Sequence, residues 1–265
     1  MKKLVLLSSL AVFFVFAACT AVPITGRKQL SLVPDSQLSQ LSDSSYKQII
    51  SESEIITSGK DVEMVRNVGG KIAMAAEAFL KENGLEAEIS SYSWEFNLIK
   101  DDATANAFCM PGGKIAVYTG ILPATKNETG LAVVVGHEVA HAIAKHGSER
   151  MSQSLIVEYG GAALAHLASE KPQETQNLVM TVYGAGANVG LILPYSRKHE
   201  LEADRIGLIL MARAGYDPSD AVRFWETMSG GASSGMEILS THPSDTKRIS
   251  EIKQHIPEAM EYYQK

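Results

Sequence analysis

The chain has 265 residues, of which 45% are hydrophobic and 20% are charged, a composition typical of a globular protein. A chain of this length can bury a sizeable core, and one large domain is expected rather than two. The formal net charge is −6 and no basic run stands out, so nucleic acid is excluded as an expected partner.

The first eighteen residues have the features of an export signal rather than of a folded element. Lys2 and Lys3 form a short basic region, and a continuous apolar run extends from Leu4 to Phe16. Such a run is typical of a secretory signal peptide and is too short for a comfortable membrane span. We therefore expect residues 1–18 to be removed; an uncleaved anchor is the alternative.

Two small residues, Ala17 and Ala18, come just before Cys19. This ending resembles a bacterial lipobox, although Phe16 stands where leucine is usual. The resemblance implies a lipoprotein signal, with Cys19 as the lipidated first residue that anchors the mature chain to a membrane. Because Thr20 rather than aspartate follows, we expect a periplasm-facing lipoprotein of the bacterial cell envelope, at the outer rather than the inner membrane. An ordinary signal with an incidental cysteine is the alternative.

The mature chain is expected to begin with an extended segment and to continue as one domain. Residues 19–35 contain two prolines and a glycine and show little periodicity, which predicts a tether or an extended arm. Residues 36–265 show no internal repeat and no second core. Their apolar spacing predicts a first helix over residues 36–56 and a second over residues 61–83.

A small β-sheet is expected next. Apolar and polar residues alternate from Tyr92 to Leu98, which predicts a strand with one buried face. Two short strands, Ala107–Met110 and Lys114–Thr119, flank Pro111-Gly112-Gly113, which indicates a hairpin. Because the rest of the pattern is mostly helical, the predicted fold class is α+β, a mainly helical domain with a small sheet.

An apolar helix that begins near Asn127 and continues toward Ile156 carries the motif His137-Glu138-x-x-His141. Histidines four residues apart lie on one face of a helix, so both imidazoles can reach the same metal ion. Glu138 lies at the edge of that face, where it could take a proton from a metal-bound water. Two core histidines beside a surface glutamate are the alternative.

Such a metal site needs a third protein ligand. In the metzincin pattern a third histidine would occupy position 147, but that residue is Gly147. His146 is no substitute, because it lies about 180° around the helix from His137, and it is expected at the surface or as a histidine near the C-terminal dipole of the helix. The third ligand must therefore come from a separate element, and a carboxylate is expected.

A helix expected over residues 196–214 supplies this carboxylate. Glu200 and Asp204 lie one turn apart on one face, and a carboxylate pair that faces a buried helix is costly unless cations or a metal neutralise it. We expect Glu200 to reach the metal and Asp204 to accept the spare N–H of a ligand histidine. Glu202 is expected to meet solvent. A salt-bridged, charged helix face is the alternative.

The remaining segments are predicted to be helical. Residues 160–190 are expected to form one or two helices with a mobile loop over the site. Helices are also expected over residues 217–228 and from Pro243 onward, with a loop over residues 230–235 between them.

Together these motifs resemble the gluzincin metallopeptidases of family M forty-eight, which include HtpX-like proteases, CAAX prenyl proteases and peptidases of mitochondrial and bacterial membrane quality control. The resemblance covers residues 35–256, and the absence of multiple membrane spans favours its exported lipoprotein branch. Besides the two ligand motifs it rests on Asn106-Ala107-Phe108, Pro111-Gly112-Gly113-Lys114-Ile115, Pro194-Tyr195-Ser196-Arg197-Lys198-His199-Glu200 and Thr241-His242-Pro243 with Arg248.

The resemblance implies a zincin-like metalloendopeptidase domain over residues 36–265. One Zn²⁺ per chain would be held by His137, His141 and Glu200, with water in the fourth position. Glu138 would then act as the general base. The resemblance also places His242 near the site, where it would donate to the oxyanion. A capping or packing histidine before a proline is the alternative for this residue.

Substrate contacts are also implied by the resemblance. Asn106 corresponds to a substrate-anchoring asparagine, with a turn asparagine as the alternative. The edge strand that pairs with an extended substrate would consist of Lys114, Ile115, Ala116, Val117 and Tyr118.

The expectations for two other residues do not involve the substrate. Arg248 could pair with Asp204 or Glu200 or lie on the surface. Cys109 is expected as a buried apolar side chain rather than a nucleophile.

The expected activity is hydrolysis of peptide bonds in unfolded or misassembled envelope proteins, a substrate class that comes from the resemblance alone. Two alternatives stay open. The chain could be an envelope assembly factor or chaperone that holds clients in the same cleft, although the complete set of site residues argues against a purely non-catalytic role. It could also be a latent enzyme whose cleft is covered by residues 170–190.

Overall fold

The computed structural model describes residues 19–22, 25–187, 193–229, 238–239, 242 and 246–263, so the expected signal peptide, residues 1–18, lies outside the described residues. The chain divides into two compact units. Unit 1 combines the N-terminal residues up to Asp35 with residues 146–198, and unit 2 combines residues 36–145 with residues 199–265. The expected tether over residues 19–35 and single domain over residues 36–265 stay predictions.

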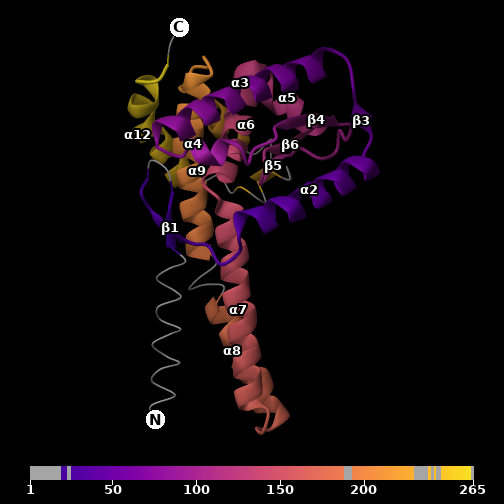
Figure 1. The fold of residues 1–265 in the computed structure, drawn as a ribbon, viewed down its shortest axis with the longest axis vertical. Helices are drawn as coiled ribbons and strands as arrows, with labels where there is room; N and C mark the ends of the chain where they lie inside the picture. The colour runs from indigo at the N-terminus through magenta and orange to yellow at the C-terminus, as the bar shows by residue number, and fades with distance from the viewer. Residues whose placement is uncertain are drawn as a thin grey trace. The chain divides into compact units, whose positions relative to one another are not determined.

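Unit 2 contains a four-stranded sheet of order β3-β4-β6-β5 (Figure 1). Its strands are β3 (Ile55–Ile56), β4 (Glu95–Ile99), β5 (Ala107–Met110) and β6 (Lys114–Tyr118). β4 and β6 are parallel, whereas the other two neighbouring pairs are antiparallel. The predicted hairpin of β5 and β6 is confirmed, and the α+β class with it.

The sheet order corrects the expected substrate edge. β6 lies between β4 and β5, so its backbone N–H and C=O groups are used on both sides. The prediction that Lys114, Ile115, Ala116, Val117 and Tyr118 form an edge strand is therefore wrong. Within the described residues the free edge next to this hairpin belongs to β5.

The strand predicted from Tyr92 begins only at Glu95. Before that residue the chain follows the hairpin turn, because Ser93 donates to the carbonyl of Gly112 over 2.8 Å. Gly113 has a φ of 82°, and a β-carbon there would lie 2.6 Å from the ring of Trp94. The turn therefore depends on glycine and on the close aromatic contact.

Helices cover this sheet. α3 (Lys60–Glu82) matches the second predicted helix and packs against α6 and β4. Its Gly69 lies against Phe96, where a β-carbon would be 2.3 Å from the ring. α2 (Asp35–Glu52) ends four residues earlier than predicted, and its buried Tyr46 donates a 2.7 Å hydrogen bond to the carbonyl of Ile115.

The helix that carries the histidine motif is shorter than predicted. α6 spans Glu128–Ile143 and is buried over nearly its whole length, and its N-terminus is capped by the side chain of Asn127. The chain then turns at Lys145, whose φ is 56°, and α7 (His146–Ala168) begins at the next residue. The expected continuous helix to Ile156 is therefore two helices, because a residue in the left-handed region cannot continue the α6 hydrogen bonds.

Unit 2 also contains the remaining short and C-terminal helices. α9 begins at Leu193 in unit 1 and reaches Arg213, and Gly215, with a φ of 84°, follows its end. The predicted final helix begins at Thr246 within the described residues. The other elements are α4 (Glu86–Ile89), the 3₁₀ helix η1 (Thr119–Ile121), α5 (Leu122–Thr125), α10 (Asp220–Ser229) and α12 (Thr246–Met260).

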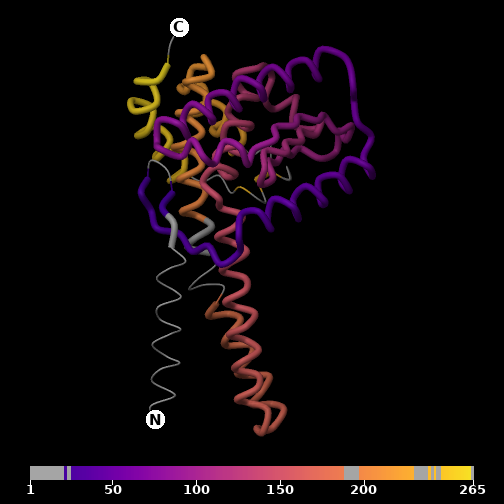
Figure 2. The backbone as a smooth tube through the Cα atoms, viewed as in Figure 1, coloured from indigo at the N-terminus to yellow at the C-terminus, as the bar shows by residue number. Residues whose placement is uncertain are grey.

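Unit 1 contains a two-stranded antiparallel sheet of β1 (Cys19–Ala21) and β2 (Lys28–Leu30) within the segment expected as a tether. α7 pairs with α8 (Gln173–Ala187), and Figure 2 shows the two helices side by side. Tyr183 on α8 donates a 2.9 Å hydrogen bond to the carbonyl of Val157 on α7. None of the helices in the described segments combines the length and apolarity that a membrane crossing requires.

Candidate metal centre

Two glycines bring the helices of the site together. Gly136 on α6 lies against Gly207 on α9, and a β-carbon on Gly136 would lie 3.1 Å from the carbonyl oxygen of Gly207. A β-carbon on Gly207 would be equally close to the backbone nitrogen of His137. The backbones can approach this closely because neither residue has a side chain. The face of α9 that carries its carboxylates therefore lies on the histidine face of α6.

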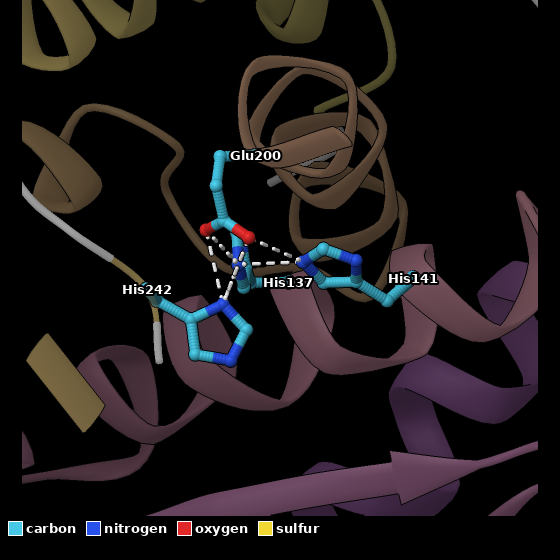
Figure 3. A group of neighbouring side chains, drawn as sticks. All are labelled: His137, His141, Glu200 and His242. Carbon is cyan, nitrogen blue, oxygen red and sulfur yellow. Dashed lines mark hydrogen bonds and ion pairs between the residues drawn. The ribbon is translucent and has the colours of Figure 1, made fainter. Parts of the chain in front are cut away.

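Four side chains meet where these helices cross (Figure 3). The Nε2 atoms of His137 and His141 lie 3.1 Å apart. Each is 3.3 Å from a different carboxylate oxygen of Glu200. With Nδ1 of His242, the ligand atoms all lie within 4.8 Å of one another, so this group could hold a metal ion. Two imidazoles and a carboxylate are a donor set that suits zinc.

His242 lies closer to the ligand group than its expected role implied. Its Nδ1 is 3.0 Å from Glu200 Oε2 and 3.2 Å from His137 Nε2. Its Nε2 is 3.4 Å from Oε1 of Glu138. One nitrogen of this ring therefore faces the ligands and the other faces the expected base. The sequence did not indicate that His242 is itself a candidate fourth ligand.

Glu138 lies beside the group that could hold a metal but does not belong to it, so its carboxylate is available to act as a base. Its side chain is buried, and its Oε1 accepts no hydrogen bond within the part of the chain that the structure describes. Buried carboxylate oxygens normally have a donor, so an oxygen without one is suited to bind a water or a proton. It lies on α6 directly after His137, and its role as the base stays a prediction.

Behind the ligands lies a chain of buried polar and aromatic contacts. Nδ1 of His137 is 2.9 Å from Oδ1 of Asp204, a distance at which the carboxylate can accept the N–H of this ring. Arg248 donates to both oxygens of Asp204, over 2.6 and 2.7 Å, and its guanidinium carbon lies 3.7 Å from the ring centre of Trp225. Arg248 therefore pairs mainly with Asp204, which settles a choice that the sequence left open.

Trp225 is a residue of the site that sequence reasoning missed. It is 1% exposed, and its ring also meets the ring of His137 at a centroid distance of 5.8 Å. The amphipathic pattern of α10 predicts that this tryptophan is buried. Nothing in that pattern indicates that it packs against Arg248.

The local charges set the protonation of this centre in the absence of a metal. Burial disfavours the carboxylate of Glu200, but hydrogen bonds from His137, His141 and His242 outweigh this and hold its pKa well below the usual range. Burial and the charge of Arg248 lower the pKa of His137, but hydrogen bonds to Asp204 and Glu200 raise it overall to about 9. A proton therefore competes with a metal ion at this imidazole.

Two expectations for neighbouring residues are wrong. Glu202 was expected to meet solvent but is 6% exposed, because α9 is enclosed on most of its faces. His146 was expected at the surface but is fully buried at the start of α7. Neither belongs to the group that could hold a metal.

β5 packs against α6, the helix that carries the expected base. Asn106 directly precedes this strand, and its carbonyl accepts a 3.0 Å hydrogen bond from the N–H of Tyr118. Burial, together with the charge of Glu138, raises the pKa of the Cys109 thiol well above its usual value. A neutral thiol is a poor nucleophile, which argues against a nucleophilic role for Cys109, but the residue is partly exposed rather than buried as expected.

The comparisons with known proteins agree with this geometry. The family model described as Peptidase family M48 matches residues 70–256, which is more than half of the chain. The mitochondrial metalloendopeptidase OMA1 of Schizosaccharomyces pombe is 34% identical over 93% of this chain and 69% of its own length. Human OMA1 is 30% identical over 95% of this chain but 48% of its own length. The β-barrel assembly-enhancing protease of Escherichia coli is 28% identical over 74% of this chain and 43% of its own length.

These relatives correct the expected localisation. The proteins that match nearly the whole chain at 30–34% identity, from two yeasts and several animals, are named as mitochondrial. The prediction of a periplasm-facing lipoprotein of a bacterial outer membrane is therefore contradicted. It rested on the residues around Cys19, which are a short and weakly specific pattern.

The family match covers both helices that carry the candidate ligands. The similarity of nearly the whole chain to metalloendopeptidases agrees with the convergence of His137, His141 and Glu200 at one point. The chain therefore belongs to peptidase family M48 and is a zinc-dependent metalloendopeptidase.

Proposed function

We propose that the protein cleaves peptide bonds in unfolded or unassembled proteins, with His137, His141 and Glu200 as zinc ligands and Glu138 as general base. The observation that carries the proposal is the meeting of these three ligand groups within 3.1–3.3 Å of one another. The unbonded oxygen of Glu138 beside them supports its role as the base.

The roles of the residues follow from their contacts. A zinc ion held by His137, His141 and Glu200 would lower the pKa of a bound water and polarise the scissile carbonyl. The carboxylate of Glu138 takes the proton of the attacking water and passes it to the leaving amine. Asp204 accepts the Nδ1–H of His137 and so keeps Nε2 of that ring free for the metal.

His242 is our proposed donor to the oxyanion. The 3.4 Å distance between its Nε2 and Oε1 of Glu138 supports this role, because both groups then border the place of the reacting carbonyl. The 3.0 Å distance between its Nδ1 and Glu200 supports the alternative that His242 is a fourth ligand.

The proposed substrate edge moves from β6 to β5. An extended peptide can add to a free strand edge through backbone hydrogen bonds. β5 lies against α6, and the charge of Glu138 raises the pKa of Cys109 on this strand, so a peptide bound there would pass close to the base. Asn106, at the start of β5, is the proposed anchor for the substrate backbone.

The substrate class is supported by a relative's name. The Escherichia coli relative is named a β-barrel assembly-enhancing protease, and by analogy we propose that the substrates of this chain are unassembled proteins. We also propose that the chain is attached to a membrane at its N-terminus. The apolar run before Cys19 and the small residues next to it support a lipid on this cysteine, which mass spectrometry of the purified protein would detect.

The substitution Glu138→Gln tests the function. It keeps the shape of the side chain but removes the base, so cleavage of an unfolded test protein should fall by about 10²–10⁴-fold. Zinc should remain bound, because Glu138 is not a proposed ligand. The measurements are the cleavage rate and the zinc content of the same preparation.

The exposed Glu63, on α3, provides a matched control, and Glu63→Gln should leave both quantities unchanged. Unchanged cleavage in Glu138→Gln would remove this residue from the mechanism. Loss of zinc from that variant would show that it supports the metal rather than the proton transfer. Retained binding of the unfolded protein without cleavage is the expected behaviour.

A further inference from the structure

The paired helices α7 and α8 of unit 1 expose an unusual amount of apolar surface. Ten large hydrophobic side chains are exposed within the described residues, and six of them lie on these two helices. Leu167 is 76% exposed and Tyr159 is 70% exposed. Exposed apolar side chains gathered on a pair of neighbouring helices indicate an interaction site. The six residues are Ile156, Tyr159, Leu167, Leu178, Met180 and Val182.

The exposed residues form a stripe on each helix. Tyr159 follows Ile156 by three residues and Leu167 follows Tyr159 by eight, which places all three on one face of α7. Leu178 and Val182 are four residues apart on one face of α8. We refer to these five residues as the apolar stripes.

α8 gains little from burial within its own unit. It has fifteen residues, and none of them is buried. A helix of this length is marginal in water by itself, and most helices in proteins are stabilised by burying an apolar face. We therefore expect a binding partner to bury the apolar stripes. The charges of the segment indicate the chemistry of this partner.

The distribution of charges over residues 146–198 favours a partner surface without net charge. Every residue from Thr175 to Ser196 is uncharged, and residues 146–198 carry as many acidic as basic side chains. A surface of phosphates or other anions would require a basic excess, and a protein interface normally has a charged or polar rim. A long uncharged stretch with exposed Leu, Val and Tyr is the composition that favours the boundary between lipid headgroups and acyl chains.

The same unit also carries the apolar N-terminus of the chain. Arg27 pairs with the buried Glu149 of α7 over 2.8 Å, and the N–H of Leu32 donates a 2.9 Å hydrogen bond to Ser152. These contacts fix the segment that contains β2 on the first turns of α7. The segment that follows Cys19, the proposed site of a lipid, therefore belongs to the same unit as the apolar stripes.

We propose that the α7–α8 pair docks on a phospholipid bilayer. The two helices lie along the membrane surface, with the apolar stripes in the boundary between headgroups and acyl chains. Within the described residues neither helix combines the length and apolarity of a membrane span, so the proposed contact is with the bilayer surface. Binding is driven by apolar contact, so it persists in high salt and does not require anionic lipid.

A site-specific fluorescent label tests the orientation in the full chain. Leu178, 64% exposed on α8, and Met74, 65% exposed on α3, form a matched pair of apolar surface positions. Each is replaced by cysteine in a chain in which Cys19→Ser and Cys109→Ala remove the native thiols, and each is labelled with an environment-sensitive dye. A third chain carries the label at Val182, in case the label at Leu178 disturbs α8.

Phosphatidylcholine vesicles are then added in low and in high salt. The labels at Leu178 and Val182 should shift to shorter wavelengths and be quenched by lipids with brominated acyl chains, whereas the label at Met74 should not change. Vesicle flotation of the same samples reports whether the chain is bound.

Every other result overturns the proposal. Flotation without a shift at Leu178 and Val182 would show attachment by another part of the chain. No flotation and no shift would show that the stripes do not bind lipid. Equal shifts at all three positions would indicate non-specific adsorption. A shift that occurs without vesicles and grows with protein concentration would assign the stripes to contact between two copies of the chain.

Discussion

At the scale of single residues, the site depends on buried charges that neutralise one another. Asp204 lies between the imidazole of His137 and the guanidinium of Arg248, and all three side chains are nearly inaccessible to water. The pKa of Asp204 is lowered: burial opposes the charged form, but the charge of Arg248 and the hydrogen bonds outweigh it. Removing one member of such a group leaves another charge buried without a partner.

We therefore predict that Arg248→Leu destabilises the protein by about 3–5 kcal/mol, the usual cost of breaking a buried ion pair. It should also weaken zinc binding by about 10–100-fold, because Asp204 no longer fixes the ring of His137. Urea unfolding measures the stability, and competition with a chelator measures the zinc affinity.

The pair of Arg205 and Glu258 provides the control. It has the same two-bond geometry, with distances of 2.8 and 2.7 Å, but both side chains are about one third exposed. Arg205→Leu should cost no more than about 1 kcal/mol and leave zinc binding unchanged. Equal effects of the two substitutions would show that the burial of Arg248 is not what matters.

The sequence was most informative about residues whose spacing alone defines their geometry. His137 and His141 share a helix, so their convergence follows from the helical repeat. The pairing of Asp204 with His137 follows from the cost of an unsatisfied buried carboxylate. The partner of Arg248 and the burial of Glu202 depend on elements far away in the chain, and no local pattern contains that information.

At the scale of elements, the site requires α6 and α9 to cross at a pair of glycines. Gly207→Ala would place a β-carbon 3.1 Å from backbone atoms of α6, which cannot move aside as a flexible side chain can. We predict a loss of about 1–3 kcal/mol in the free energy of unfolding, as is usual for overpacking. Weaker zinc binding should accompany it, because Glu200 moves away from the histidines.

Gly70 on α3 is the matched control, since a β-carbon there meets nothing within 4 Å. Gly70→Ala should stabilise the protein by about 0.5–1 kcal/mol, because alanine is the better helix former. The two substitutions thus have opposite expected signs in the same urea titration. A stabilising Gly207→Ala would mean that the helix crossing tolerates a wider spacing.

The position of an element could be predicted where neighbouring residues determine it. It could not be predicted where contacts between distant segments determine it. The β5–β6 hairpin follows from Gly112 and Gly113, and α3 follows from its apolar repeat. The order of the strands decides which one is an edge, and this depends on the parallel pairing of β4 with β6. Lys145, at which the helix breaks, is itself neither glycine nor proline, so its positive φ could not be predicted from the residue type.

At the scale of the whole molecule, the ligands come from segments that lie far apart in the sequence. α6 supplies two of them, α9 supplies the third, and His242 follows still later. An unfolded chain does not hold these groups together, so a metal ion binds mainly to the folded state. Binding of this kind stabilises the fold by an amount that depends on the concentration and affinity of the ion.

We therefore predict that removal of zinc lowers the melting temperature. At a free zinc concentration of about 1,000 times the dissociation constant, the stabilisation should be about 4 kcal/mol. Thermal unfolding with zinc and with a chelator measures the difference. In Glu200→Ala the chelator should have a much smaller effect, because one of the three proposed ligands is missing. An equal effect of the chelator on both proteins would place the stabilising metal elsewhere, and no effect on the wild type would show that the folded chain does not depend on zinc.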